Sequence, residues 1–400
     1  MQSGWRVGSI LGIPLFIDRS WFIILVLITL ANGLNPDWQT QWGELAWVMG
    51  FAMALLLFGS VLLHELGHSI AAKFQGIGVN SITLFLFGGI ASIDRESKTP
   101  GGAFKVAIAG PLVSFGLFLL LSALVQGVAL PQPIALVLFN VAYINLVLTL
   151  FNLIPGLPLD GGQVLKALVW KLTDSRVQGI RWAARSGQVL GWVAIALGLG
   201  MILINQDYSG LWIAAIGWFA LRNAAAYQQV TNLQEAMLAL TAADAMGRDF
   251  RVVDAHTSLR NFAEAYLLEE HHPPAYFAAS EGRYRGLVSI EAIRTIERGQ
   301  WPQRTLQDIA QPLLTIPSVR EQTPLTEVIA KLEELALPRL TVLTPADAVA
   351  GVIDRGDIVQ AIAERLGLGV APAMIQRIKE EGEYPPGLQL AAIARSVAED

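Results

Sequence analysis

Long apolar segments in the first 226 residues constrain the fold of this chain more than any other feature. Most of them approach the ~20 residues that an α-helix needs to cross a bilayer. Charged residues make up only 15% of the chain, and the mean hydropathy is +0.48. The sequence therefore predicts a polytopic α-helical membrane protein with six transmembrane helices. The six segments are 14–33, 46–73, 104–129, 134–155, 188–205 and 209–226.

The charged residues divide the chain into two parts. Residues 1–226 contain nine Asp or Glu and twelve Lys or Arg, whereas the remaining 174 residues contain 24 acidic and 16 basic side chains. We expect a membrane domain over 1–226, a linker over 227–240 and an acidic soluble part after the linker. An acidic soluble part offers no concentrated basic face, so we expect no nucleic-acid partner.

Lys and Arg alternate between the connections of the predicted helices. The N-terminus, the second and fourth connections and the residue after the last helix are basic, and the other connections contain no Lys or Arg. Basic loops of membrane proteins stay on the cytoplasmic side. We therefore expect the N-terminus and the soluble part in the cytoplasm, and we assign the protein to the bilayer of a prokaryotic cell membrane.

A cluster of ionisable residues interrupts the second apolar segment at His64, Glu65 and His68. Residues four apart share a helix face, so both imidazoles can bind one ion, and a Glu beside the first His can act as a general base. No charged residue lies between Trp47 and Leu63, and ionisable groups inside a membrane helix are costly and usually functional. The alternative is a helix-end cluster at the cytoplasmic surface.

Two histidines and a glutamate at this spacing are typical of a catalytic zinc site, and the third zinc ligand should be a carboxylate. A catalytic zinc site has three protein ligands and a water. The chain has no cysteine, and its other three histidines lie in the soluble part. Asp160 follows the fourth helix in TLFNLIPGLPLDGG, where irregular backbone is tolerated at membrane depth only if it is buried or lines a cavity. The alternative for Asp160 is a turn-forming role before Gly161.

Three stretches of the membrane part resemble the site-2 protease family of intramembrane zinc metalloproteases, which is peptidase family M50. They are HELGH at 64–68, FGGIASI with IAGPLVS at 87–114, and FNLIPGLPLDGG at 151–162. The resemblance implies one zinc ion on His64, His68 and Asp160. It also implies Glu65 as the catalytic base and Asn152 near the active site, where its amide steadies the substrate or the oxyanion. The alternative for Asn152 is an interhelical hydrogen bond.

The segment NSITLFLFGGIASID, residues 80–94, is too short to span as a helix and is rich in Thr, Leu, Phe and Ile. We predict a strand or hairpin, a small membrane-associated β element at the cytoplasmic interface. Gly88 and Gly89 allow close backbone approach. A helical substrate must unwind before water attacks its amide, and an exposed strand edge can hold the unwound chain. The alternative is a hairpin that only packs on the helices.

Residues 241–365 contain an internal repeat of about 65 residues. TAADAMGRDF resembles TLQDIAQPLL, and YRGLVSIEAI resembles VAGVIDRGDIV. Each unit predicts short strands with helices between them, and the two together resemble a pair of CBS domains, which form a cytoplasmic α/β tandem module. The expected bounds are CBS domain 1 at 241–300, CBS domain 2 at 301–366 and a C-terminal tail at 367–400.

The CBS resemblance implies an adenine nucleotide that regulates the attached domain. The second repeat keeps Gly351 and Asp357 of the nucleotide motif, in which the Asp holds the ribose hydroxyls. Asp354 replaces the threonine that contacts phosphate, and its charge would repel a phosphate. The first repeat has Ala292 in place of the Asp. The alternative is a purely structural role, or a homodimer formed through the CBS domains.

The predicted function is hydrolysis of peptide bonds in the transmembrane helix of a membrane-protein substrate, under control of the CBS pair. Two other classes stay open: a CBS-regulated membrane ion transporter and a non-proteolytic membrane sensor, each using the same metal site. Glu65 favours the protease, because a transporter has no reason to place a carboxylate next to the first of two histidines that share a helix face.

Overall fold

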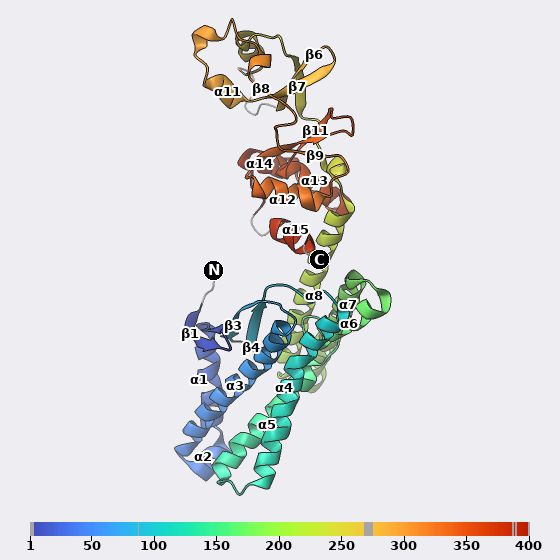
Figure 1. Cartoon of the computed structure of the whole chain (residues 1–400). Helices are drawn as coiled ribbons and strands as arrows, with labels where there is room; N and C mark the ends of the chain where they lie inside the picture. The colour runs from blue at the N-terminus through green and yellow to red at the C-terminus, as the bar shows by residue number, and fades with distance from the viewer. Residues whose placement is uncertain (1–3, 87, 268–274, 386–387, 389, 399–400) are drawn as a thin grey trace. The chain divides into compact units, whose positions relative to one another are not determined.

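The computed structural model describes residues 4–86, 88–267, 275–385, 388 and 390–398. The chain folds into two compact units, residues 1–229 and residues 230–400 (Figure 1). The first unit is a bundle of helices with one small sheet, and the second contains two sheets with helices packed around them. Each unit has its own hydrophobic core.

Four helices of the described part of the first unit are long and apolar enough to cross a membrane. α3 packs against α1 (Ser20–Gly33), α4 and α5, and α4 also packs against α6 (Asp160–Thr173). Large apolar side chains are exposed along these helices, as expected of a surface that faces lipid. The chain is an integral membrane protein. The four helices are α3 (Leu45–Lys73), α4 (Pro100–Gly127), α5 (Gln132–Asn152) and α7 (Arg176–Asn205).

The structure gives four or five spans in the described residues instead of a clear six. α1 and α2 (Pro36–Trp42) reach the length of a span only together, and a 65° bend separates them. α8 (Gly210–Ala239), which contains the sixth predicted segment, is not among the helices that qualify by length and apolar composition.

The prediction for the first segment, 14–33, is wrong at its start. Residues Ile13–Ile17 form strand β2, which pairs with β1 (Trp5–Ile10), and α1 begins only at Ser20. The Asp18 carboxylate accepts hydrogen bonds from the backbone N–H and the hydroxyl of Ser20 at 2.9 and 2.6 Å, which fixes the helix start. A short apolar stretch suits a strand as well as a helix, so composition alone could not separate the two.

The predicted hairpin at 80–94 is confirmed. β3 (Val79–Phe85) and β4 (Gly88–Ile93) pair antiparallel, and β3 also pairs in parallel with β2, so the sheet has the order β1-β2-β3-β4. The sheet packs on α3 through a core that contains Leu66 and Ile82. No described strand covers the outer side of β4, so this edge is available for pairing with another chain.

The fourth predicted connection, residues 156–187, is largely helical, and its description as a loop is wrong. It contains α6 and the first turns of α7. The basic side chains lie on helices, and Lys166 is 4% exposed because it pairs with Glu96 at 2.8 Å. A Lys whose charge is paired can be buried in a packed helix, so a basic residue at this position does not indicate a loop.

α7 and α8 pack against each other through glycines. A Cβ on Gly191 would lie 2.8 Å from the carbonyl oxygen of Gly217, and a Cβ on Gly198 would also be in close contact with the carbonyl oxygen of Gly210. The two contacts are seven residues apart on each helix, so the two backbones approach closely along the hairpin. α8 then continues to Ala239, through nearly all of the segment 227–240 that we expected to be a linker, and its last turn lies in the core of the second unit.

The sequence repeat of the second unit is also a structural repeat. In each copy two parallel strands are followed by an antiparallel one, and each copy opens with a Thr–Asp capping box, at Thr241 with Asp244 and at Thr305 with Asp308. The first copy contains α9 (Ala242–Ala245), β5 (Phe250–Asp254), α10 (Leu259–Phe262), β6 (Ala275–Ser280), β7 (Arg283–Val288) and α11 (Ile290–Arg294). β8 (Ala310–Gln311) follows the second capping box in the sequence but pairs with β7 in the sheet of the first copy. The second contains β9 (Ser318–Arg320), α12 (Leu325–Glu334), β10 (Arg339–Leu343), β11 (Val349–Asp354) and α13 (Arg355–Leu366).

The C-terminal tail folds back onto the second copy. α14 (Pro372–Glu381) packs against α13, and α15 (Leu390–Ala398) packs against α12. Leu390 and Ala394 are fully buried in the same core as the last turn of α8. The tail therefore completes the core of the second repeat.

Candidate metal centre

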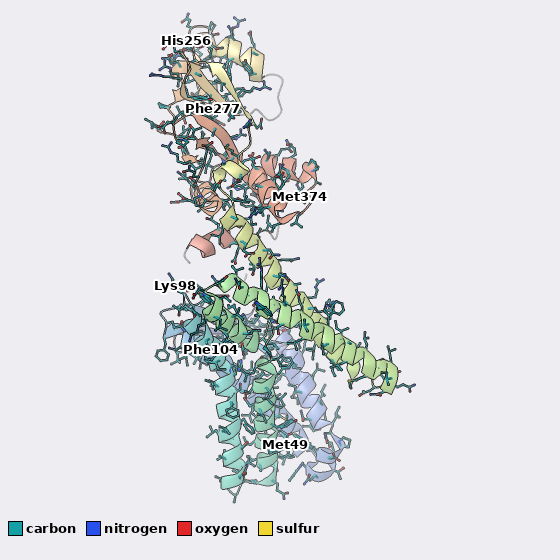
Figure 2. The ribbon with its side chains drawn as sticks, turned by 90° about the vertical axis from the view of Figure 1, so that its right-hand side faces the viewer. Met49, Lys98, Phe104, His256, Phe277 and Met374 are labelled. Carbon is teal, nitrogen blue, oxygen red and sulfur yellow. The ribbon has the colours of Figure 1, made fainter. Side chains whose placement is uncertain are left out.

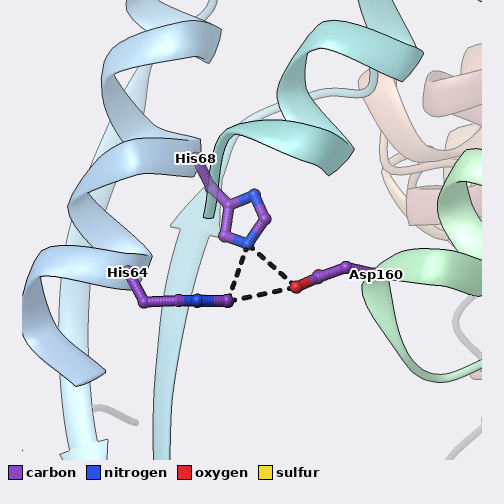
Figure 3. Close-up of side chains that lie close together, drawn as sticks. All are labelled: His64, His68 and Asp160. Carbon is purple, nitrogen blue, oxygen red and sulfur yellow. Dashed lines mark hydrogen bonds and ion pairs between the residues drawn. The ribbon is translucent and has the colours of Figure 1, made fainter. Parts of the chain in front are cut away.

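The two histidines of the HELGH stretch point from one face of α3 toward the same place (Figure 3). His64 and His68 are 4% and 8% exposed, and their Nε2 atoms are 3.3 Å apart. Met49, near the start of α3, lies toward one end of the bundle, and Lys98 and Phe104 lie toward the other (Figure 2). The histidines belong to the second half of α3 and are buried inside the bundle.

Asp160 is the first residue of α6, and its carboxylate reaches both histidines (Figure 3). Its Oδ2 atom is 3.1 Å from Nε2 of His64 and 3.3 Å from Nε2 of His68. Within the described residues, these three side chains are the group whose ligand atoms lie close enough together, all within 4.8 Å, to hold a metal ion.

A tightly folded break between α5 and α6 places Asp160. A Cβ on Gly161 would overlap the carbonyl of Leu153, and a Cβ on Gly162 would overlap the backbone N of Leu157. Leu157 is 1% exposed and belongs to a core that it shares with α7. The two glycines after Asp160 therefore let the break pack directly on the first turn of α6, which fixes where the carboxylate lies.

α4 contacts the Nδ1 atom of each imidazole. Nδ1 of His64 lies 2.9 Å from the hydroxyl oxygen of Ser114, and Nδ1 of His68 lies 2.7 Å from the carbonyl oxygen of Val106. Gly110 lies midway between these residues on α4, and a Cβ there would collide with the Nε2 atoms of both histidines. The missing side chain leaves space at the point where the Nε2 atoms converge.

The three ligand atoms have the spacing that a zinc ion requires. With zinc bonds of about 2.0–2.1 Å, the corners of a tetrahedron lie about 3.3 Å apart. The observed separations are 3.1, 3.3 and 3.3 Å. Two imidazoles and one carboxylate are also a ligand set of catalytic zinc sites that keep a position for water. The residues present therefore fit zinc, which His64, His68 and Asp160 would hold.

Glu65 lies between this cluster and the open edge of the sheet. Its carboxylate lies close enough to interact electrostatically with His64, His68, Asp160 and the backbone N–H of Ala91 on β4. The backbone of β4 touches the Glu65 side chain also at Gly89, where an added Cβ would meet Cγ of the glutamate. Glu65 is thus adjacent both to the metal ligands and to the edge strand.

Asn152 is the last residue of α5, where the break that leads to Asp160 begins. Its side chain is half-buried and is not one of the three clustered ligands. Its role at the active site stays a prediction.

The two predicted nucleotide-binding residues, Gly351 and Asp357, lie in the second unit. The Asp357 carboxylate accepts a hydrogen bond from Lys379 of α14 at 2.6 Å. Burial and the charge of Asp354 raise the pKa of Asp357, although Lys379 acts in the opposite direction. Gly351 faces backbone, because an added Cβ would lie 2.7 Å from the carbonyl oxygen of Gly247. The tail therefore holds the carboxylate that the resemblance gives to a ribose.

A cavity of about 550 Å³ lies between the two repeats of the second unit. Its described lining includes Lys379 but neither Gly351 nor Asp357. The lining has more carboxylates than cations, so its field disfavours highly charged anions. The charged lining residues are Asp249, Glu291, Asp354 and Glu380, with Arg339 and Lys379 as the cations.

The sequence analysis missed the ion pairs that connect α6 and the start of α7 to the segment after β4. Lys166 donates to Glu96 at 2.8 Å, and Arg176 donates to the same carboxylate at 3.0 Å. Burial would raise the pKa of Glu96, but the charges and hydrogen bonds of the two cations outweigh it and hold that pKa below its ordinary value. The sequence feature that could have indicated these pairs is Lys166, a basic residue six positions after Asp160 in a mostly apolar stretch.

Comparison with known proteins agrees with this geometry. The profile of Peptidase family M50 matches residues 52–135 and 123–194, which include both histidines and Asp160. The protein sll0528 of Synechocystis is 41% identical over 364 residues, which cover 90% of this chain and 96% of the relative. The chain belongs to peptidase family M50. The family expected from the sequence is confirmed.

Other relatives of this M50 protein match over the same length. Rip3 of Mycobacterium tuberculosis is 33% identical over 90% of this chain and 93% of its own, and the zinc metalloprotease MJ0392 of Methanocaldococcus jannaschii is 27% identical over 91% and 97%. The solved structure of the site-2 protease from Methanocaldococcus jannaschii aligns at 29% identity over 56% of this chain and 95% of that chain, with a TM-score of 0.40. The CBS domain profile matches residues 307–364, within the second repeat.

The substitution Gly110→Ala tests the packing of the cluster. Because the added methyl group must displace both imidazoles, we expect zinc affinity to fall by roughly 10–100-fold, the range seen when ligand orientation is disturbed. Competition with a zinc chelator measures this affinity on the purified protein. Gly116→Ala on the same helix is the matched control, because a Cβ there meets nothing within 4 Å. Wild-type zinc affinity in Gly110→Ala would contradict the geometry.

Proposed function

We propose that this M50 protein is an intramembrane zinc metalloprotease that hydrolyses peptide bonds within the transmembrane segments of membrane-protein substrates. The observation that carries the proposal is the convergence of His64, His68 and Asp160 beside Glu65, in a unit whose helices are apolar enough to cross a membrane. The family supports it, since the relative MJ0392 is named a zinc metalloprotease.

The residues around the cluster have distinct roles in the reaction. Zinc would acidify a water molecule and polarise the substrate carbonyl. Glu65 takes a proton from the water while the water oxygen bonds to the carbonyl carbon of the substrate. Glu65 then gives that proton to the nitrogen of the departing peptide as the C–N bond breaks. Asn152 is the residue we propose to hold the substrate or the developing oxyanion by its amide.

The open edge of β4 is the surface that we propose for the substrate. A peptide bond inside a helix is shielded, so the substrate must unwind, and an extended chain can pair with a strand edge through backbone hydrogen bonds. The Glu65 side chain lies against the backbone of β4 at Gly89, where an added Cβ would be 2.5 Å from its Cγ atom. A chain paired beside β4 therefore comes within reach of the base. Gly88 and Gly89 add no side chain that would obstruct the approach.

We propose six membrane crossings, with α1 and α2 as one bent span and the first half of α8 as the last. The alternation of basic and uncharged connections supports a cytoplasmic N-terminus and a cytoplasmic second unit. The membrane is the cell membrane of a prokaryote, in keeping with relatives in Synechocystis and Mycobacterium tuberculosis.

Replacing Glu65 by Gln separates the protease from an ion transporter or a sensor. Glutamine keeps the shape but cannot accept the proton, so we expect cleavage of single-span model substrates to fall by roughly 10²–10⁴-fold while zinc content stays unchanged. The control is Glu44→Gln, because Glu44 is exposed at the other end of α3. Cleavage at the wild-type rate by zinc-loaded Glu65→Gln would contradict the proposed role. Ion flux without cleavage in the wild type would favour transport.

For the second unit, we propose that the CBS pair binds an adenine nucleotide that regulates the protease. The cavity between the repeats has a size typical of ligand pockets. Asp357 is not a described lining residue of this cavity, but it pairs with Lys379, which is, so we propose that Asp357 reaches a ribose only when Lys379 releases its carboxylate. The excess of acidic lining residues favours a nucleotide with few phosphates. Binding is thus coupled to a displacement of Lys379 on α14.

Titration of the full-length protein with AMP tests this site. Hydrogen bonds to a charged group contribute about 1.5–3 kcal/mol, so we expect Asp357→Asn to weaken AMP binding by roughly 10–100-fold. Asp347→Asn serves as the control, since Asp347 is exposed and pairs with Arg320. Equal AMP affinity in Asp357→Asn and wild type, or no AMP binding to the wild type, would remove the site.

A further inference from the structure

The face of α4 that meets the metal ligands has a regular composition. Val106, Gly110 and Ser114 are spaced by four residues, so they form one stripe along the helix. The stripe offers a carbonyl oxygen to His68, an open space to both Nε2 atoms and a hydroxyl group to His64. Each position meets a different requirement of the same two imidazoles.

The two imidazoles differ in how firmly their hydrogen position is set. The carbonyl of Val106 can only accept, so Nδ1 of His68 carries the hydrogen and Nε2 keeps its lone pair for a metal. The hydroxyl of Ser114 can donate or accept, but it accepts when Nε2 of His64 binds an ion. The Ser114 hydroxyl thus provides Nδ1 of His64 with a hydrogen-bond acceptor, as the Val106 carbonyl does for Nδ1 of His68.

The burial of Ser114 shows that its hydroxyl is placed for a polar partner. The side chain is 0% exposed in a helix that is long and apolar enough to cross a membrane. A buried hydroxyl without a partner costs free energy. Here the oxygen lies 2.9 Å from Nδ1 of His64, a ring that is itself 4% exposed. A packing role alone would be filled as well by alanine.

We propose that Ser114 is a positioning residue of the zinc site: its hydroxyl accepts the Nδ1 hydrogen of His64, which turns the Nε2 lone pair toward the ion. The inference rests on the proposed zinc site and extends it by one residue on a different helix. Outer partners of metal-bound histidines fix the hydrogen position and the ring orientation, and removing one typically lowers metal affinity by roughly 10–100-fold.

The test compares Ser114→Ala, Ser114→Thr and Ser60→Ala in the full-length protein. Ser60 is the matched control, because it is also buried, lies one turn before His64 and bonds to Asn145 instead of to a ligand. Zinc affinity is measured by chelator competition, and the visible absorption bands of the Co²⁺-loaded protein report the ligand geometry. Neither readout needs a substrate. We expect a loss of roughly 10–100-fold in zinc affinity and altered Co²⁺ bands for Ser114→Ala only, with threonine restoring both.

Each other outcome overturns the proposal. Wild-type affinity and bands in Ser114→Ala would show that His64 needs no hydroxyl partner. Equal losses in Ser114→Ala and Ser60→Ala would show a general packing defect. Failure of threonine together with alanine would show that the volume at this position matters instead of the hydroxyl. If the wild type itself binds no zinc, the proposed function fails, whereas zinc bound equally by wild type and Ser114→Ala removes only this inference.

Discussion

Two imidazoles and a carboxylate have to meet at one point inside a bundle of apolar helices, and the structure of the first unit depends on that meeting. Polar groups buried there are costly unless each is bonded. Nε2 of His64 and of His68 lie beside the Asp160 carboxylate, and both Nδ1 atoms are bonded to α4. Three helices, α3, α4 and α6, are therefore fixed against one another by the same few polar contacts.

That convergence requires backbones to approach closely, and glycine makes the approach possible. Gly67, inside the HELGH stretch, lies where a Cβ would come 2.9 Å from the carbonyl oxygen of Ala109 on α4. Gly110 leaves space beside the imidazoles from the other side, and Gly161 allows the break before α6 to fold tightly. These small residues restrict the geometry as much as the ligands do, because a methyl group at any of them displaces a helix or a ring.

The sequence predicted what local spacing controls. The i, i+4 histidines identified one helix face, and the lack of cysteine limited the third ligand to a carboxylate. The resemblance of TAADAMGRDF to TLQDIAQPLL identified the repeat, and in the structure each of these stretches begins with a Thr–Asp capping box. It failed where long-range contacts decide. The strand Ile13–Ile17 forms because β3 lies beside it, and α6 forms although it carries basic residues, because Lys166 finds Glu96. Neither partner is visible from local periodicity.

Other features depend on distant pairs in the same way. IAGPLVS stood out as a stretch, but only the fold shows that Ser114 meets His64, fifty residues earlier in the chain. Asp357 fitted a nucleotide motif by spacing, yet Lys379 from the tail lies against its carboxylate. The sequence motif identifies Asp357 as a carboxylate that could bind a ribose, whereas the fold shows that Lys379 competes for the same carboxylate.

X-ray absorption at the zinc edge of the purified full-length protein tests the central claim most directly, because it reads the ligands without a substrate. The account predicts zinc bound only by nitrogen and oxygen, with the scattering of two imidazoles, and loss of the ion when Asp160 is replaced by Ala. A zinc site with fewer than two imidazoles, or one that survives the loss of Asp160 unchanged, would contradict it.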